Sequence, residues 1–168
     1  MEELVEKAKN NDKNAFTRLI LNIEKDLYCI AKSKINNEND IEDIIQETMI
    51  LAFYNIKKLK DNRYFKTWII RILINNCNKF YKKKQKSFGE NYVFDKVESC
   101  EMDLADIEFQ DFISFLKEDE RIILTLYYYL GYTTKEISMI LHKREGTICS
   151  KISRAKVKIK TKYKGEFR

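Results

Sequence analysis

The chain has 168 residues, of which 44% are hydrophobic and 12% aromatic, which is enough to bury a core and excludes wholesale disorder. It contains no proline and only four glycines, the residues that tight turns need, so the composition argues against an all-β protein and favours long helices. The net charge of +6 is unevenly spread, with 18 basic and 12 acidic side chains in residues 1–87, 2 and 11 in residues 88–120, and 12 and 3 in residues 121–168. Two basic blocks that flank an acidic one predict two surfaces that face a polyanion.

The first half of the chain, residues 1–87, has the pattern of one helical domain. Helices are expected over residues 14–35, 41–58 and 65–83, separated by polar breaks at residues 36–40 and 60–63. Asp40 is the predicted N-cap of the second helix. That helix has the clearest apolar stripe of the chain, formed by Ile41, Ile44, Ile45, Thr48, Met49, Ala52, Phe53 and Ile56.

The second half separates into a linker and a smaller domain. Residues 88–104 are acidic and show no sustained period, so we expect a flexible linker there. The predicted domain, residues 105–168, begins with helices at about 105–116 and 118–130. Thr133 and Glu136 fit a capping box that opens a short helix, and a further helix is expected to start near Glu145 after a tight turn. The sequence therefore predicts an all-α protein of two small helical domains.

The two short helices at the carboxy-terminal end have the pattern of a helix-turn-helix. One side of the second helix is apolar, while the other side carries hydroxyl and basic groups that can bond to base edges and phosphates in a major groove. The candidate DNA-binding residues here are Arg144, Thr147, Ser150, Lys151, Arg154 and Lys158. The alternative is a basic amphipathic helix on a soluble domain, since runs of charge are usually solvated faces.

The sequence offers no chemistry for catalysis, metal or cofactor binding. The four cysteines are too far apart for a C-x-x-C pair, the only histidine is His142, and there is no phosphate-binding G-x-x-x-x-G-K-[ST] loop. We therefore expect no catalytic residue, no metal and no cofactor. The N-terminus does not have the pattern of a signal peptide, and the longest uncharged run, 13 residues from Ile122, is too short to span a bilayer. A soluble, cytoplasmic protein without membrane insertion is expected.

Three stretches resemble motifs of one protein family. Residues 145–155 (EGTICSKISRA) resemble the x-G-T-V-x-S-R-x-x-R-A signature of sigma region 4. Residues 40–54 (DIEDIIQETMILAFY) and 65–75 (FKTWIIRILIN) are similar to two stretches of sigma region 2. The family is that of the bacterial RNA polymerase sigma factors, sigma-70 family, of the extracytoplasmic-function (ECF) group. Two positions depart from it: Lys79 stands where many members have Asp, and Met49 where Phe is common.

The second predicted helix presents an acidic, amide-bearing stripe opposite its core side, which suits a protein partner better than DNA. The resemblance implies that this partner is core RNA polymerase, through the clamp helices of its largest subunit, with further contact to its flap. The candidate core-binding residues are Asp40, Asp43, Gln46, Glu47, Ile50 and Tyr54.

The next segment, residues 57–86, holds 11 basic side chains and only one acid, with aromatic residues interleaved. Basic groups hold phosphates and aromatic faces stack unpaired bases, so this segment predicts contact with melted DNA. The resemblance implies that the loop at residues 60–64 captures a flipped base of the −10 element. Phe65 and Trp68 are more simply explained as core. The candidate −10 residues are Lys60, Asn62, Arg63, Tyr64, Arg71, Asn75, Lys79, Lys82 and Lys83.

The resemblance implies a sigma factor that brings polymerase to promoter DNA and opens it, with no catalysis of its own. The alternative is a stand-alone helix-turn-helix regulator with an unrelated helical sensor domain, which would bind duplex DNA without polymerase. Members of the ECF group are typically held inactive by an anti-sigma partner, and some act without one. No residue of this sequence decides between the two.

Overall fold

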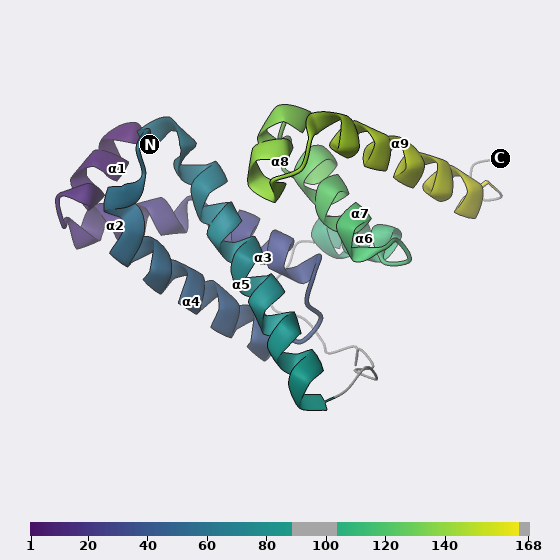
Figure 1. The fold of residues 1–168 in the computed structure, drawn as a ribbon, viewed down its shortest axis with the longest axis horizontal. Coiled ribbons are helices and arrows are strands. Elements are labelled where there is room, and N and C mark those ends of the chain that lie inside the picture. Colours follow the sequence, from purple (N-terminus) through teal and green to yellow (C-terminus); the bar gives the residue numbers. More distant parts are fainter. Residues whose placement is uncertain (89–103, 165–168) are drawn as a thin grey trace. The chain divides into compact units, whose positions relative to one another are not determined.

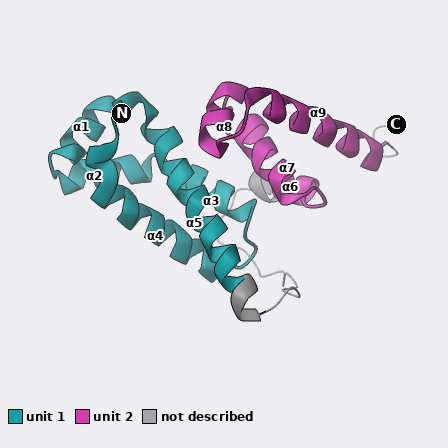
Figure 2. Cartoon of the chain, in the orientation of Figure 1, with its two compact units in different colours: residues 1–98 teal, residues 99–168 magenta. Residues whose placement is uncertain are grey.

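The computed structural model describes residues 1–88 and 104–164, and every regular element in this part of the chain is helical. The chain divides into two compact units, residues 1–98 and 99–168 (Figure 2). The predicted all-α class with two small helical domains is confirmed. The linker predicted over residues 88–104 lies, apart from its two end residues, outside the described residues.

The first unit is built around a pair of long helices. Its elements are α1 (Glu2–Lys9), α2 (Lys13–Leu21), α3 (Glu24–Lys32), α4 (Glu38–Asn55), the short 3₁₀ turns η1 (Ile56–Lys58) and η2 (Asn62–Tyr64), and α5 (Phe65–Phe88). Helices α4 and α5 lie side by side, and α3 packs against both of them (Figure 1). The two long helices therefore form the frame on which the surfaces of this unit are displayed.

Apolar side chains at helical spacing close the core of the first unit. Leu27 of α3, Ile41 of α4 and Leu73 of α5 are fully buried, and burying a side chain of this size contributes about 1.5–3 kcal/mol. A polar pair lies among them: the amide of Asn76 donates to the hydroxyl of Thr48 (3.1 Å), which donates to a backbone carbonyl of its own helix. Because each buried polar group has a partner, the pair links α4 to α5 without an unsatisfied group.

The structure corrects three sequence-based expectations in this unit. The single helix predicted over residues 14–35 is two helices, interrupted at Asn22 and Ile23, where the N–H of Ile23 turns back to the carbonyl of Ile20 (2.8 Å). The cap of α4 is Asn37, whose side chain accepts from the N–H of Asp40 (3.1 Å), so Asp40 lies inside the first turn. Helix α1 was not predicted at all. Apolar periodicity reports which residues are buried and not whether the helix continues. Ile23 is buried, so the periodicity continues across the interruption.

The second unit contains α6 (Leu104–Ile113), α7 (Glu118–Leu124), a π-helical turn η3 (Thr125–Tyr129), α8 (Thr134–Leu141) and α9 (Glu145–Lys162). The helix predicted over residues 118–130 is therefore α-helical only in its first half. In the second half the N–H of Leu130 donates to the carbonyl of Thr125 (3.0 Å), five residues back, which widens the turn. Gly131 then takes a φ of +72°, which glycine adopts without strain.

Helices α8 and α9 form the predicted helix-turn-helix (Figure 1). The capping box is confirmed: the hydroxyl of Thr133 accepts from the N–H of Glu136 (3.2 Å), and the carboxylate of Glu136 accepts from the N–H of Thr133 (2.8 Å). His142 ends α8 in a left-handed conformation, and α9 begins at Glu145 as predicted. Ile148, Ile152 and Ala155 are buried, so the apolar side of α9 faces the unit's core.

Candidate functional site

One side of α4 carries the group of residues that we name the acidic stripe: Asp43, Gln46, Glu47, Ile50 and Tyr54. All five are exposed, and Ile50 and Tyr54 have 56% and 77% of their surface accessible. They follow one another at helical spacing, while Ile41, Ile45 and Thr48 on the opposite side of α4 are buried. Two large apolar side chains between carboxylates and an amide form a surface that a protein partner can cover.

The structure separates Asp40 from the acidic stripe, although sequence reasoning grouped them. Its carboxylate accepts from the ammonium group of Lys84 on α5 (2.6 Å), and both side chains are largely covered. Because Asn37 takes the capping position, Asp40 projects from the first turn of α4 toward the carboxy-terminal half of α5. Asp40 is therefore a link between two helices of the same unit.

The loop between α4 and α5 presents Arg63 and Tyr64. Tyr64 is 47% exposed, and the guanidinium group of Arg63 lies 6.0 Å from the centre of its ring. Asp61 accepts from the backbone N–H of Arg63 (3.0 Å) and binds its guanidinium group (2.7 Å). The side-chain and backbone hydrogen bonds from Arg63 lower the pKa of Asp61 below its ordinary value. Lys60 is exposed, whereas Asn62 is partly covered by α1.

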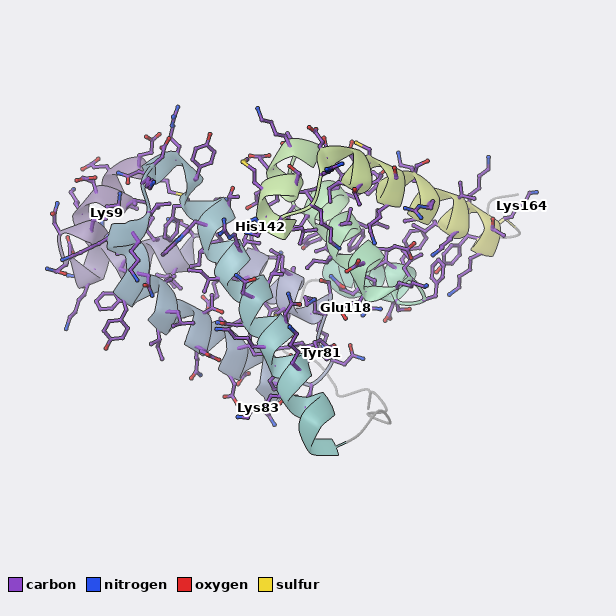
Figure 3. All side chains as sticks on the ribbon, viewed as in Figure 1. Lys9, Tyr81, Lys83, Glu118, His142 and Lys164 are labelled. Atoms are coloured by element: carbon purple, nitrogen blue, oxygen red, sulfur yellow. The ribbon has the colours of Figure 1, made fainter. Side chains whose placement is uncertain are left out.

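Helix α5 displays the residues that we name the α5 basic stripe: Arg71, Asn75, Lys79, Lys82 and Lys83. All are exposed, and Figure 3 labels Lys83 on the carboxy-terminal half of the helix. Over residues 1–88 and 104–164, the side chains of the first four take part in no hydrogen bond or ion pair. The helix thus offers a row of basic groups and one amide to an external ligand.

The aromatic residues at the start of α5 belong to the interior. Phe65 is fully buried, and Trp68 is partly buried with its ring centre 6.1 Å from that of Phe65. The expectation that Phe65 is a core residue is confirmed. The aromatic face available for stacking near this loop is that of Tyr64.

The outer side of α9 carries Thr147, Ser150 and Arg154, all exposed, and Arg144 is exposed at the turn before the helix. The hydroxyl of Ser150 donates to the carbonyl of Gly146 (2.7 Å), and Nε of Arg154 donates to the carbonyl of Ser150 (3.2 Å). These bonds run along the helix and hold the side chains against its outer side. The three residues and Arg144 can therefore reach a ligand that meets the amino-terminal half of α9.

Lys151 and Lys158 also lie on α9, but carboxylates of α7 bind them. Asp119 accepts from Lys151 (2.8 Å) and from Lys143 in the turn (2.8 Å), and Glu120 accepts from Lys158 (2.6 Å). The hydrogen bonds from Lys143 and Lys151 lower the pKa of Asp119 to about 2. Burial raises the pKa of Glu120, but the hydrogen bonds from Lys158 and the backbone of Lys117 outweigh burial and leave it below its ordinary value.

Sequence reasoning missed both α7 carboxylates, because acidic residues in the first turn of a helix are expected for the helix alone. The relevant partners lie 32 and 38 positions further on. Of the six predicted residues of this surface, four face outward without a partner from α7 and two are in internal ion pairs.

The described residues contain no group of three or more histidine, cysteine, aspartate or glutamate side chains that could hold a metal ion. Within the same residues, no helix is long and apolar enough to cross a membrane. Cys29 and Cys77 are buried and Cys149 is exposed.

Two family models match the chain. The model described as Sigma-70 region 2 covers residues 19–87, and the model described as Sigma-70, region 4 covers residues 106–159. Each match falls within one of the two compact units. Together they cover more than half of the residues.

Curated relatives match over almost the full length. The ECF RNA polymerase sigma-E factor of Haemophilus influenzae is 27% identical, over 95% of this chain and 93% of its own. The RNA polymerase sigma-H factor of Pseudomonas aeruginosa is 26% identical, over 92% and 89%.

Two solved structures share the fold. CnrH, solved with the cytosolic domain of CnrY, superposes with a TM-score of 0.73 at 20% identity and covers 95% of this chain and 94% of its own. The sigma factor RpoE of Bartonella quintana, solved with the anti-sigma factor NepR, also has a TM-score of 0.73, at 22% identity over 89% and 97%.

Proposed function

The chain belongs to the sigma-70 family of RNA polymerase sigma factors, in its extracytoplasmic-function group, and we propose how its surfaces divide the work of promoter recognition. Residues 1–87 bind core polymerase and the −10 element, and residues 105–168 bind the −35 element. Residues 88–104 link these two domains. The observation that supports this proposal is the order of the two family matches along one chain, each on a unit that exposes charged side chains of its own.

The acidic stripe of α4 is the proposed contact with the clamp helices of the polymerase's largest subunit. Its two carboxylates, Asp43 and Glu47, would repel DNA phosphates, and its exposed Ile50 and Tyr54 supply apolar area of the kind that dominates protein interfaces. Asp40 lies beside this surface at the start of the helix, and its carboxylate can bind the polymerase only by giving up the ion pair with Lys84.

The loop at residues 60–64 and the α5 basic stripe are the proposed binding surface for the melted −10 strand. Lys79, Lys82 and Lys83 hold phosphates, while Arg71 and Asn75 lie nearer the loop on the same side of the helix. Stacking of one base on an aromatic ring such as Tyr64 contributes about 1–3 kcal/mol, which offsets much of the few kcal/mol needed to unstack the base.

The outer side of α9 is the proposed reader of the −35 element. Arg154 and Arg144 can pair with guanine edges or phosphates, and Thr147 and Ser150 can serve either. Lys151 and Lys158 reach DNA only if its phosphates displace the carboxylates of Asp119 and Glu120. The same domain, residues 105–168, is also proposed to contact the flap of core polymerase.

We further propose that the chain lacks catalysis, works in the cytoplasm and has an anti-sigma partner. The chain has no catalytic activity, since the polymerase performs the chemistry. It works in the cytoplasm, where the polymerase is. An anti-sigma factor is a third partner, because the RpoE structure of the same fold contains one. Addition of such a partner to a reconstituted system should stop transcription that depends on this chain, and transcription that continues unchanged contradicts this part.

The test of the function is a pull-down with purified core polymerase, followed by run-off transcription from genomic fragments with and without the chain. We expect a stable complex and new transcripts with defined start sites. A stand-alone regulator would instead bind duplex DNA by itself and leave core polymerase in the unbound fraction.

A further inference from the structure

Helix α1 lies outside the residues that match the region 2 model, yet it packs against the loop that this model includes. It contacts both short helical turns, η1 and η2, between α4 and α5. Val5 and Ala8 form its buried side, and Ile56 and Leu59 of the loop are buried as well. The first helix of the chain therefore supports a loop that lies more than fifty positions further along.

The polar part of this contact is a pair of hydrogen bonds to the side-chain amide of Asn62. The ammonium group of Lys9 donates to Oδ1 of Asn62 (2.5 Å), and Nδ2 of Asn62 donates to the carboxylate of Glu6 (2.9 Å). Glu6 and Lys9 are three positions apart, so they lie on the same side of α1. Figure 3 labels Lys9. A cation on the amide oxygen and an anion on the amide nitrogen fix the orientation of the amide.

The residues next to Asn62 depend on its position. Asp61 on one side caps η2 and holds Arg63, and Tyr64 follows with nearly half of its surface exposed. A loop that is held in place before DNA arrives does not incur, on binding, the conformational-entropy cost of ordering its residues. A fixed Asn62 thus sets the directions of Arg63 and Tyr64.

We propose that α1 is the positioning element of this loop: Glu6 and Lys9 hold Asn62, and through Asn62 they fix how Arg63 and Tyr64 meet the promoter strand. This inference builds on the proposed role of the loop in binding the −10 strand. It changes the role of Asn62 from a DNA contact to a positioning residue, because an amide engaged at both ends must give up a bond before it can pair with a base.

The test exchanges the charges around the amide. Asn62→Asp places a second carboxylate against Glu6, and Glu6→Lys leaves Nδ2 of Asn62 without an acceptor. In the variant that combines Glu6→Lys with Asn62→Asp, one carboxylate lies between two ammonium groups, so the link is restored in another form. Glu3→Lys is the matched control, since it makes the same charge change on α1, where Glu3 pairs with Lys7 and, among the described residues, makes no ion pair with the loop.

The measurement uses the full chain bound to core polymerase. Run-off transcription is compared between the promoter recovered in the genomic experiment and the same promoter with single substitutions in its −10 element. Affinity for core polymerase is measured in parallel. The ratio of the two transcription rates reports base discrimination, which a general loss of folded protein would not change.

Each single variant, Asn62→Asp or Glu6→Lys, should lower base discrimination about fivefold, the effect of about one hydrogen bond, with core affinity retained. The combined variant should recover to within about twofold of the wild type, and Glu3→Lys should equal the wild type. A combined variant as poor as Asn62→Asp would overturn the proposal and assign Asn62 to DNA directly. Discrimination unchanged in every variant would overturn it as well.

The same assay separates this inference from the function on which it builds. Arg63→Ala and Tyr64→Ala should each reduce discrimination if the loop meets the promoter strand. Full discrimination in both of these variants would reject the loop as a DNA-binding element, whatever Asn62 does.

Discussion

Asp119 shows how one carboxylate decides which cations of the second unit are available to DNA. It lies on α7 and binds Lys143 of the turn and Lys151 of α9, so it ties α7 to two parts of the helix-turn-helix. Arg144 and Arg154 have no such partner from α7. Of the cations predicted to bind DNA on this surface, the two arginines, which can form bidentate contacts with bases, therefore have no α7 carboxylate as partner, whereas Lys151 and Lys158 do.

The effect of Asp119 on stability should depend on pH. Its pKa in the folded chain, about 2, lies below the ordinary value of 3.8, so its contribution is complete above about pH 4 and is lost as the pH falls through about 2. Asp119→Asn should lower the free energy of unfolding near neutral pH by less than about 1 kcal/mol, since the side chain is half exposed and solvent screens the pair. The difference should vanish below pH 2. Urea unfolding of the full chain across this pH range measures it.

Asp111→Asn is the matched control for this experiment, because Asp111 is an exposed aspartate of α6 for which the structure gives no ion pair among its described residues. It should follow the wild-type curve at every pH. An Asp119→Asn variant that also follows that curve would contradict a stabilising role for the pairs.

Individual pairings were the part of the structure that sequence reasoning could not reach. Asn62 and Glu6 are 56 positions apart, and Asp40 and Lys84 are 44 apart. Periodicity places a residue on a side of its own helix but does not say which helix packs there. Exposure of Ile50 and Tyr54 followed from periodicity alone, whereas the internal roles of Asp40, Lys151 and Lys158 required the packing.

Helix α4 has two different sides, and its outer side should bind the polymerase through apolar area. Ile50→Ala should weaken affinity for core polymerase about fivefold or more, the usual effect of truncating an anchor at an interface centre. Leu21→Ala is the matched control, because Leu21 is an exposed aliphatic residue of α2 outside the acidic stripe. Binding measured by titration of labelled core polymerase compares the two. An equal loss of affinity for core polymerase in both variants would contradict the assignment of the acidic stripe to the interface.

The capping box makes the start of α8 a point where one hydroxyl stabilises a helix. Thr133→Ala removes an acceptor from the N–H of Glu136 and should lower the local stability of α8 by about 1 kcal/mol. Hydrogen exchange of the α8 amides measures this. Thr161→Ala is the matched control, because Thr161 is exposed and its hydroxyl bonds within α9. It should change the protection of the α8 amides by less than about 0.5 kcal/mol. Protection of α8 that is the same in both variants would contradict the cap's contribution.

Helices were predictable where a stripe of apolar residues and a start signal coincide. Both held for α8, whereas the stripe located α4, α5 and α9, and the cap expected for α4 was one that the structure moves from Asp40 to Asn37. The interruption at Asn22 and Ile23 and the π-helical turn after Leu124 escaped prediction, because buried side chains continue in step through both. Helix α1 did carry a helical pattern. Val5 and Ala8 are three positions apart, with acidic residues in the first turn and basic residues in the last turn, but the helix is short.

The two proposed DNA-binding surfaces belong to different compact units, so their contributions should add. Tyr64→Ala should weaken promoter binding through the −10 element, and Arg154→Ala should cost about 1–3 kcal/mol through the −35 element with core affinity unchanged. The combined variant should show the sum within about 0.5 kcal/mol. Promoter affinity of the polymerase complex, measured at one fixed salt concentration, provides all three values. A combined loss no larger than either single loss would mean that the two residues act on one site.

The resemblance of three stretches in order was enough to predict the family. The scarcity of glycine and proline and the helical spacing of apolar residues were enough to predict the all-α class with two helical domains, because these depend on composition and short spacings. The contact of α1 with the loop at residues 60–64 required the tertiary structure, since it joins segments that share no motif.

The buried hydrogen bond from Asn76 to Thr48 joins the packed helices α4 and α5 into one body. If α4 binds core polymerase and α5 binds the opened strand, the strand lies at a fixed distance from the polymerase contact. That distance is on the order of the 8–10 Å between the axes of packed helices. No bending inside this body can accommodate a promoter whose melted stretch is shifted by a nucleotide. Such a promoter should be used poorly, and transcripts should begin within a narrow window.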